Sequence, residues 1–355
     1  MKTILTVVGA RPNFMKAAPL LRQLRQSPNL NSLLVHTGQH YDKNMSDIFF
    51  DDLDIEKPNY MLNIGSGTQS YQTGQIMEKF EDVCTQVNPD LIIVLGDINS
   101  TMACSIVAKK LHIKLAHIEA GLRSNDRNMP EEINRLITDA ISDFFFITEK
   151  SAEKNLINEG QDKNKIFFSG NLMIDSLHYG LDKIKNLPNA KNDDYGLITL
   201  HRPSNVDDYT NLKNIINDLK NISNKIKLYF SIHPRTKKQI EYHGINLGEN
   251  ITILDPQSYL EFLHLMRDSK VIFTDSGGIQ EESTVLKIPC YTLRHNTERP
   301  ITVSQGTNRL TFPERENIFN TFTKFKFDIN SSYKLPEGWD GKTAQRIVKI
   351  LNEEL

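Results

Sequence analysis

The sequence predicts an α/β protein made of two doubly wound, Rossmann-like domains. Short apolar runs rich in β-branched residues recur along the chain, and segments of helical periodicity lie between most of them. This rhythm pauses once and then starts again. Buried strands that alternate with helices form parallel sheets covered on both faces. The 355 residues are enough for two such domains, since one domain takes roughly 100–200 residues.

The first domain is expected over residues 1–175. Its clearest helices are 17–26 and 101–111, whose apolar residues recur with helical spacing. Its expected strands are 4–8, 33–36, 91–95, 115–119, 144–148 and 166–168.

The second domain is expected over residues 176–355, after the polar stretch 187–195 interrupts the pattern. Its expected helices include 211–222 and 258–268. The amphipathic segment 343–351 predicts a last helix, which can stay in this domain or return to the first. The expected strands are 196–200, 226–231, 251–254, 271–274 and 290–293.

Composition excludes several classes of function. A net charge of -2 argues against a protein that binds nucleic acid or a membrane through a broad basic surface. Three widely spaced cysteines form neither a disulfide framework nor a zinc-binding pair, which favours the cytoplasm. No segment approaches the roughly 20 apolar residues of a membrane span.

In open α/β sheets, ligands bind beyond the carboxyl ends of the strands, so two such domains predict an active site in the cleft between them. After the first strand, Gly9 permits a tight turn and Arg11 supplies a cation, with Lys16 one helical turn or so later. The following helix start offers free amides to an anion. The alternative is a plain turn with a surface arginine, and the glycines do not form a dinucleotide fingerprint.

Three acidic residues of the first domain lie at expected strand ends or at a helix start. Asp97 follows one strand, Glu119 ends the next, and Glu131 opens a helix after Pro130. His117 and Glu119 are expected to point the same way, because side chains alternate along a strand. Helix capping explains Asp97 and Glu131 equally well when each is taken alone.

In the second domain, His201 with Arg202 and His233 with Arg235 follow successive strands. A histidine and an arginine at both strand ends suit a negatively charged ligand. The alternative for each histidine is a structural role.

The segment Thr274–Glu282, which directly follows Val271-Ile272-Phe273, is the strongest signal. It reads strand, Ser276-Gly277-Gly278, helix and then Glu282, which is the layout of a nucleotide-diphosphate site. Glu282 can accept hydrogen bonds from a ribose diol, and Phe262 can line a slot for a base. A structural glycine turn is the alternative, and Arg299 lies in a polar segment that follows the next strand.

These residues carry a resemblance to the non-hydrolysing UDP-N-acetylglucosamine 2-epimerases. The shared motifs occur in family order and cover about the first 310 residues. They are GARPNFMKAAPL (9–20), TGQH (37–40), GDINST (96–101), HIEAGLRS (117–124), PEEINR (130–135), HRPSNVDD (201–208), TDSGGIQEES (274–283), RHNTERP (294–300) and GTNRL (306–310).

The resemblance implies the two-domain fold of the GT-B glycosyltransferases and inversion at C2 of UDP-GlcNAc, which gives UDP-ManNAc. The family eliminates UDP to leave 2-acetamidoglucal and then adds UDP back. It needs no metal or nicotinamide cofactor, and it is commonly homodimeric. Its UDP-ManNAc-type products usually feed bacterial surface polysaccharides.

The resemblance also implies roles for individual residues. Asp97, Glu119 and Glu131 match the acids that remove and return the C2 proton, and His201 would act near the leaving diphosphate. Residues expected to bind the substrate or balance its charge are Arg11, Lys16, Arg135, Arg202, His233, Phe262, Ser276, Gly277, Gly278, Glu282 and Arg299.

The sequence departs from the family at two places. It has His201-Arg202-Pro203-Ser204-Asn205 where many members have His-Arg-Arg-Glu-Asn. Regulated members bind a second UDP-GlcNAc through a Gln-His-x-x-Gln motif and an arginine. Here Gln39-His40 is followed by Tyr41-Asp42, and no arginine lies between Tyr60 and Gln75, so we expect no requirement for this effector.

Several alternatives stay open from the sequence. The same chemistry acts on oxidised, diamino or deoxy UDP-sugars in related enzymes. A hydrolysing epimerase would release free ManNAc and UDP, a glycosyltransferase would need an acceptor, and a UDP-sugar sensor would need no clustered acids.

Overall fold

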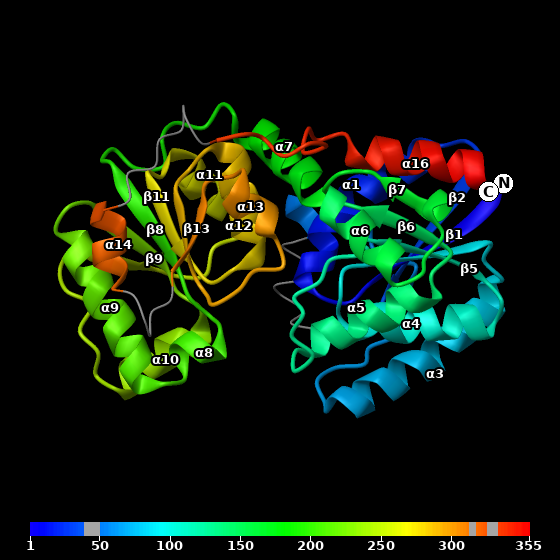
Figure 1. Ribbon diagram of the computed structural model, residues 1–355, viewed down its shortest axis with the longest axis horizontal. Helices are drawn as coiled ribbons and strands as arrows, with labels where there is room; N and C mark the ends of the chain where they lie inside the picture. The colour runs from blue at the N-terminus through cyan, green and yellow to red at the C-terminus, as the bar shows by residue number, and fades with distance from the viewer. Residues whose placement is uncertain (39–49, 312–316, 325–332) are drawn as a thin grey trace. The chain divides into compact units, whose positions relative to one another are not determined.

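The computed structural model of the chain describes residues 1–38, 50–311, 317–324 and 333–355. These residues form two compact units, which we describe one at a time (Figure 1). The first unit is Met1–His178 together with Glu337–Leu355, and the second unit is Tyr179–Pro336. The division falls within helix α7 (Leu172–Ile184), and the last helix is part of the first unit.

In the first unit, the described residues form a seven-stranded parallel sheet of order β3-β2-β1-β4-β5-β6-β7. Neighbouring strands pair in register, for example Leu5 of β1 with Leu33 of β2. The strands are β1 (Lys2–Val8), β2 (Leu30–His36), β3 (Tyr60–Met61), β4 (Leu91–Leu95), β5 (Lys114–Ile118), β6 (Phe144–Ile147) and β7 (Ile166–Phe168).

Helices connect these strands and cover the sheet (Figure 1). The last helix, α16, packs against α1, and Asp175 of α7 accepts hydrogen bonds from the α16 amides of Thr343 and Ala344 at 3.1 and 2.8 Å. The described helices are α1 (Arg11–Gln26), α3 (Gln69–Val87), α4 (Asn99–Lys110), α5 (Pro130–Ile141), α6 (Lys150–Asn158), the short 3₁₀ helix Lys163–Lys165, α7 and α16 (Thr343–Glu354).

The second unit repeats the plan with a parallel sheet of order β10-β9-β8-β11-β12-β13 among its described residues. Its strands are β8 (Tyr195–Thr199), β9 (Lys227–Ser231), β10 (Ile251–Leu254), β11 (Val271–Thr274), β12 (Cys290–Leu293) and β13 (Asn308–Thr311). Its described helices are α8 (Pro203–Val206), α9 (Tyr209–Ser223), α10 (Pro234–Tyr242), α11 (Tyr259–Asp268), α12 (Gly277–Leu286), α13 (Pro300–Ser304) and α14 (Ile318–Lys324).

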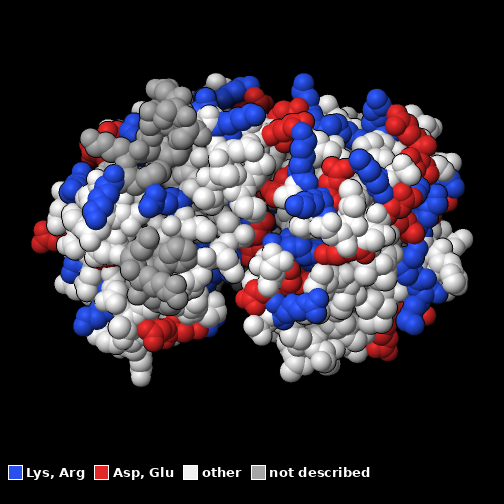
Figure 2. Space-filling model, viewed as in Figure 1, with Lys and Arg blue, Asp and Glu red and all other residues white. Residues whose placement is uncertain are grey.

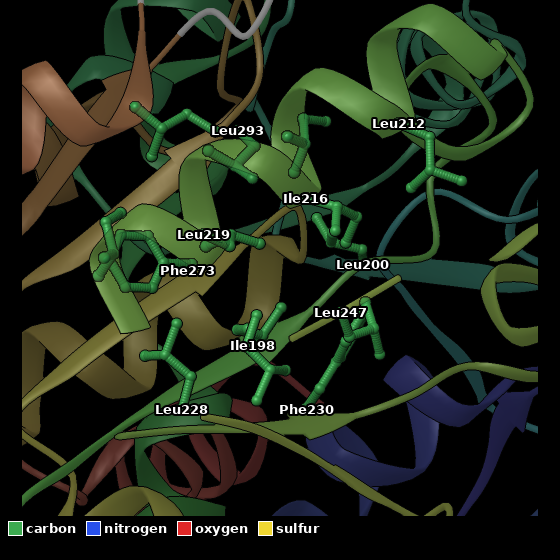
Figure 3. Close-up of a cluster of buried hydrophobic side chains, with 14 of the residues drawn as sticks. Ile198, Leu200, Leu212, Ile216, Leu219, Leu228, Phe230, Leu247, Phe273 and Leu293 are labelled. Carbon is green, nitrogen blue, oxygen red and sulfur yellow. The ribbon is translucent and has the colours of Figure 1, made fainter. Parts of the chain in front are cut away.

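The core of the second unit lies between the sheet and helix α9 (Figure 3). Ile198, Phe230 and Phe273 of three strands pack with Ile216 and Leu219 of the helix, and all of these side chains are fully buried. Apolar strands with both faces covered are what a parallel sheet requires, since helices lie on each side of it.

The predicted fold class is confirmed, since both units are parallel α/β sheets wound with helices. One local prediction is wrong. Strand β5 ends at Ile118, and Glu119 has a φ of 72°, in the left-handed region. Side-chain alternation therefore does not extend from His117 to Glu119. Strands β3 and β13 were not predicted, because they are short and lack a long apolar run.

Basic and acidic side chains are interspersed over the visible face of the first unit (Figure 2), in keeping with the net charge of -2. None of the described helices is long and apolar enough to cross a membrane.

Candidate active site

Each sheet reverses its winding between two neighbouring strands, and the candidate residues follow these strands. In the first unit the reversal lies between β1 and β4, and in the second unit between β8 and β11. The connections diverge at such a switch point and leave a crevice beyond the carboxyl ends of the strands. Each unit therefore carries its own set of candidate side chains at its own switch point.

The turn after β1 is held by Asn13 at the switch point. Its side-chain oxygen accepts hydrogen bonds from the amides of Gly9 and Ala10 at 3.2 and 3.3 Å, and its nitrogen donates to the Leu95 carbonyl at 2.9 Å. Asn13 therefore occupies the amides of these two residues, which directly precede helix α1. The side chain of Arg11 lies outside the described part of the chain.

Lys16 and Glu119 form an ion pair with only 8% of each side chain exposed. The left-handed backbone of Glu119 turns this carboxylate out of the strand and toward the helix that carries Lys16. A Cβ added at Gly96 would lie 3.2 Å from the Lys16 ammonium nitrogen. Lys16 therefore pairs with Glu119 and also lies close to the turn that carries Asp97.

Asp97 pairs with Arg135 of helix α5, and its side chain remains 31% exposed. Asn134 of the same helix donates to the Asp97 main-chain carbonyl at 2.9 Å. Helix α5 thus fixes both the side chain and the backbone of Asp97. A partly exposed carboxylate beside a guanidinium is suited to exchanging a proton with a ligand.

Two adjacent glutamates at the start of α5 have different environments. Glu131 is exposed and lies one turn before Arg135, so their side chains are neighbours on the helix surface. Glu132 is buried and accepts from the amides of Ser124 and Asn125 at 2.9 and 3.0 Å. Burial raises the pKa of Glu132, but these bonds and the pairing with Arg135 lower it below its usual value.

In the second unit, the fully buried Asp275 connects the loops after β8 and β11. Its carboxylate accepts from the amides of His201 and Arg202 and from the side chain of Asn205, at 3.0, 2.9 and 3.1 Å. Burial raises the pKa of Asp275, but the bonds from His201 and Arg202 lower it below its usual value. Asp275 lies within the segment Thr274–Glu282 but was not predicted as a site residue.

Asp275 also orients His201, whose Nδ1 lies 2.7 Å from the carboxylate while 44% of the side chain remains exposed. The rings of His201 and His233 lie 6.1 Å apart. Arg202 donates through Nε to the Asp275 carbonyl at 2.9 Å. The structure therefore brings His201, Arg202 and His233 to one edge of the sheet.

The amino end of helix α12 carries Ser276, Gly277 and Gly278, all half-buried. The guanidinium of Arg299 is 3.5 Å from the position of a Cβ on Gly277. Arg299 also pairs with Glu281 at 2.7 Å. A helix amino end beside an arginine is suited to a diphosphate.

Glu282 lies one turn into α12, buried against Tyr259. The Tyr259 hydroxyl donates to its carboxylate at 3.0 Å. Burial raises the pKa of Glu282 to about 8, a net value that includes a lowering by the hydrogen bond from Tyr259 and a raising by the nearby Glu281. Phe262 follows Tyr259 by three residues on α11, which places the two rings on one helix face.

In each unit, the sequence-predicted residues lie on loops that follow strands or on the helices beside these loops. Buried partners that were not selected from the sequence include Glu132, Asp275 and Tyr259. A buried carboxylate has no pattern of its own in the sequence. Among the described residues, no group of three or more His, Cys, Asp and Glu side chains could hold a metal ion.

Glu282 should make the stability of the protein fall as pH rises from about 4.5 to about 8. In this range the folded protein keeps a proton that the unfolded chain has lost, so the unfolded state binds fewer protons. Glu282→Gln cannot lose this proton. Between about pH 5 and pH 8, the free energy of unfolding of this variant should therefore rise relative to that of the wild type by roughly a few kcal/mol. Urea unfolding at both pH values measures the difference.

The matched control is Glu241→Gln, which changes an exposed glutamate of the same unit. Its difference from the wild type should not depend on pH. A pH-independent difference for Glu282→Gln would show that Glu282 ionises normally in the fold.

A family model described as UDP-N-acetylglucosamine 2-epimerase matches residues 22–352. A Methanocaldococcus jannaschii protein named UDP-N-acetylglucosamine 2-epimerase is 43% identical over 97% of both chains. A Pseudomonas aeruginosa protein named UDP-2,3-diacetamido-2,3-dideoxy-D-glucuronate 2-epimerase is 42% identical over 98% of this chain and 99% of its own.

Solved structures agree with these sequence matches. The crystal structure of Methanocaldococcus jannaschii UDP-GlcNAc 2-epimerase in complex with UDP-GlcNAc and UDP matches with a TM-score of 0.90 and 42% identity, over 99% of both chains. That of the Neisseria meningitidis enzyme bound to UDP-GlcNAc matches with a TM-score of 0.89 and 32% identity, over 99% of this chain and all of that one. With nearly its whole length matched in both sequence and fold, this chain belongs to the UDP-N-acetylglucosamine 2-epimerase family.

Proposed function

We propose that this protein inverts C2 of a UDP-2-acetamido sugar, with UDP-GlcNAc and UDP-ManNAc as the first pair to test. The observation that carries the proposal is the acidic group of the first unit. There Glu119 pairs with Lys16, Asp97 pairs with Arg135, and Glu131 is exposed one turn from Arg135. Binding alone would not require three carboxylates, whereas moving a proton off and on carbon needs groups that can accept and donate it.

The chemistry follows from the substrate. No carbonyl is attached to C2, so its hydrogen is too weakly acidic for simple removal. A carboxylate takes the C2 proton while the bond between C1 and the diphosphate oxygen breaks, which leaves UDP and 2-acetamidoglucal. UDP then adds back to C1 while a carboxylic acid returns a proton to the other face of C2. Asp97, Glu119 and Glu131 share these transfers.

The second unit would bind the UDP part of the substrate. The amino end of α12 and Arg299 suit the diphosphate, and Glu282 suits the ribose diol. Phe262 is half-buried on α11 and suits the uracil ring. His201 would meet the leaving diphosphate, because Asp275 holds its Nδ1 side and leaves the other ring nitrogen for the ligand.

A second candidate substrate is a UDP-diacetamido-dideoxy-glucuronate. The observation that favours it is the 42% identity to the Pseudomonas aeruginosa relative, which nearly equals the 43% to the Methanocaldococcus jannaschii relative. Both sugars carry the 2-acetamido group and both reactions invert C2, so the acidic group would serve either one. Overall sequence identity does not distinguish the two candidate substrates, so both are tested in the same assay.

Three further expectations stay predictions. The cytoplasm is the expected compartment, supported by three buried free cysteines. A homodimer is expected from the family, and light scattering coupled to gel filtration tests it. The absence of a requirement for UDP-GlcNAc as an effector rests partly on Asp42, which lies outside the described residues.

Incubation with UDP-GlcNAc in D2O should place deuterium at C2 of the product, with no added metal or nicotinamide. Elimination and re-addition exchange the C2 hydrogen with solvent through the carboxylates, and proton NMR follows both sugars. The glucuronate substrate is assayed in parallel.

Product without deuterium at C2 would contradict the proton-transfer mechanism. Free ManNAc with UDP would move the assignment to a hydrolysing epimerase. Turnover of only the glucuronate would select the second candidate.

Asp97→Asn, Glu119→Gln and Glu131→Gln should each lower kcat by about 10²–10⁴-fold while UDP still binds. Each change keeps the size of the side chain but removes its ability to carry a proton. The matched control is Asp90→Asn, since Asp90 directly precedes β4 and so lies at the opposite edge of the same sheet from Asp97. The control should keep the turnover of the wild type, and near-normal turnover in two of the three acid variants would overturn the assignment.

A further inference from the structure

A buried chain of charged groups lies behind the Asp97 turn of the first unit. His117 is fully buried, and its Nδ1 is 2.6 Å from the Asp139 carboxylate. Its Nε2 is 2.8 Å from the main-chain carbonyl of Gly96, the residue before Asp97. The other oxygen of Asp139 accepts from the Gly121 amide at 3.0 Å and pairs with Arg123 at 2.7 Å.

Both ring nitrogens of His117 face acceptors. The Gly96 carbonyl can only accept a hydrogen bond, so Nε2 must donate to it. An ionised Asp139 can only accept as well, so Nδ1 must donate too. The Gly121 amide and the Arg123 guanidinium both donate to the Asp139 carboxylate, and such donors favour its ionised form. A ring that donates from both nitrogens is an imidazolium.

The Gly96 carbonyl is one of several points at which the Asp97 turn is held, and the Gly96 amide donates to the Ile118 carbonyl at 3.0 Å. Arg135 holds the Asp97 carboxylate and Asn134 holds the Asp97 carbonyl. Arg135 and Asn134 lie on α5, and so does Asp139, which holds His117. Gly96 has a φ of 66°, a backbone that other residues rarely adopt. The hydrogen bond from His117 thus fixes the peptide group that aims Asp97.

We propose that His117, held as an imidazolium by Asp139, is a positioning residue for Asp97. It cannot exchange protons with the substrate, because it is fully buried and both ring nitrogens are occupied. It acts by fixing the position of the Asp97 carboxylate and by placing a positive charge behind the turn. The proposal rests on the proposed role of Asp97 in the epimerase reaction.

Nitrogen NMR of the wild-type protein labelled with 15N-histidine tests the charge state without any assay of activity. Both ring nitrogens of His117 should carry a hydrogen at neutral pH, and His117→Phe identifies the signals by their loss. A bare ring nitrogen on His117 would overturn the imidazolium. This result is independent of whether the protein epimerises either sugar, so it separates a failure of this proposal from a failure of the proposed function.

Kinetics test the positioning. His117→Phe keeps a ring but removes both donors, and kcat should fall on the order of 100-fold, because a displacement of about 1 Å at a reacting group has that effect. KM and the affinity for UDP should change by less than about threefold, since a lost catalytic geometry lowers kcat rather than ground-state binding. Unchanged kcat, or a loss confined to KM, would overturn the positioning role.

Two further variants complete the test. Ser105→Ala is the matched control, because Ser105 is equally buried in the same unit and donates to the Thr101 carbonyl at 2.7 Å, away from Gly96. It should keep the kcat of the wild type. If His117→Phe does not fold, His117→Gln carries the comparison, since its amide nitrogen can donate to the Gly96 carbonyl. Its kcat should fall less than that of Asp97→Asn, and an equal fall would contradict the proposal.

Discussion

A carboxylate removed from water must be surrounded by hydrogen-bond donors, and this constraint shapes the functional loops in both units. In the first unit, Asp139 accepts from Gly121, Arg123 and His117, and the neighbouring Glu132 accepts from the loop that precedes its own helix. In the second unit, Asp275 accepts from the loop that carries His201. Apart from His117, which lies on β5, these donors belong to loops that also carry exposed polar side chains. Satisfying the buried anion therefore also fixes the groups that can meet a ligand.

The parallel sheets determine where these loops gather. Every strand in such a sheet ends at the same edge, and the switch points between β1 and β4 and between β8 and β11 leave room there. Asn13 bridges the first switch point by bonding the Leu95 carbonyl, and Asp275 bridges the second by bonding the His201 amide. The first group is rich in carboxylates paired with cations. The second is built from a helix amino end, histidines and arginines. This division matches a substrate with a sugar to be deprotonated and a diphosphate to be held.

Much of this could be predicted from the sequence, because strand-end polar residues and the Ser276-Gly277-Gly278 turn are local patterns. What the sequence could not show is which of two similar residues faces inward. Glu131 and Glu132 are adjacent, and only their packing makes the first exposed and the second a buried anchor. The left-handed turn at Glu119 broke an alternation that was assumed from periodicity. The amides of Gly9 and Ala10 are taken by Asn13, a contact that depends on the exact path of the helix start. Tyr259 lies 23 residues from Glu282 and only the fold joins them.

The central claim is that the bond between C1 and the diphosphate oxygen breaks and re-forms while the acids move the C2 proton. Positional isotope exchange tests this claim most directly. UDP-GlcNAc is prepared with 18O in the oxygen that bridges C1 and the β-phosphorus, and phosphorus NMR follows the label during turnover. A freed UDP can rotate its terminal phosphate before it adds back, so the account predicts that 18O appears in the non-bridging positions of the recovered UDP-sugar. Epimerised product with all of its 18O still in the bridging position would contradict the account.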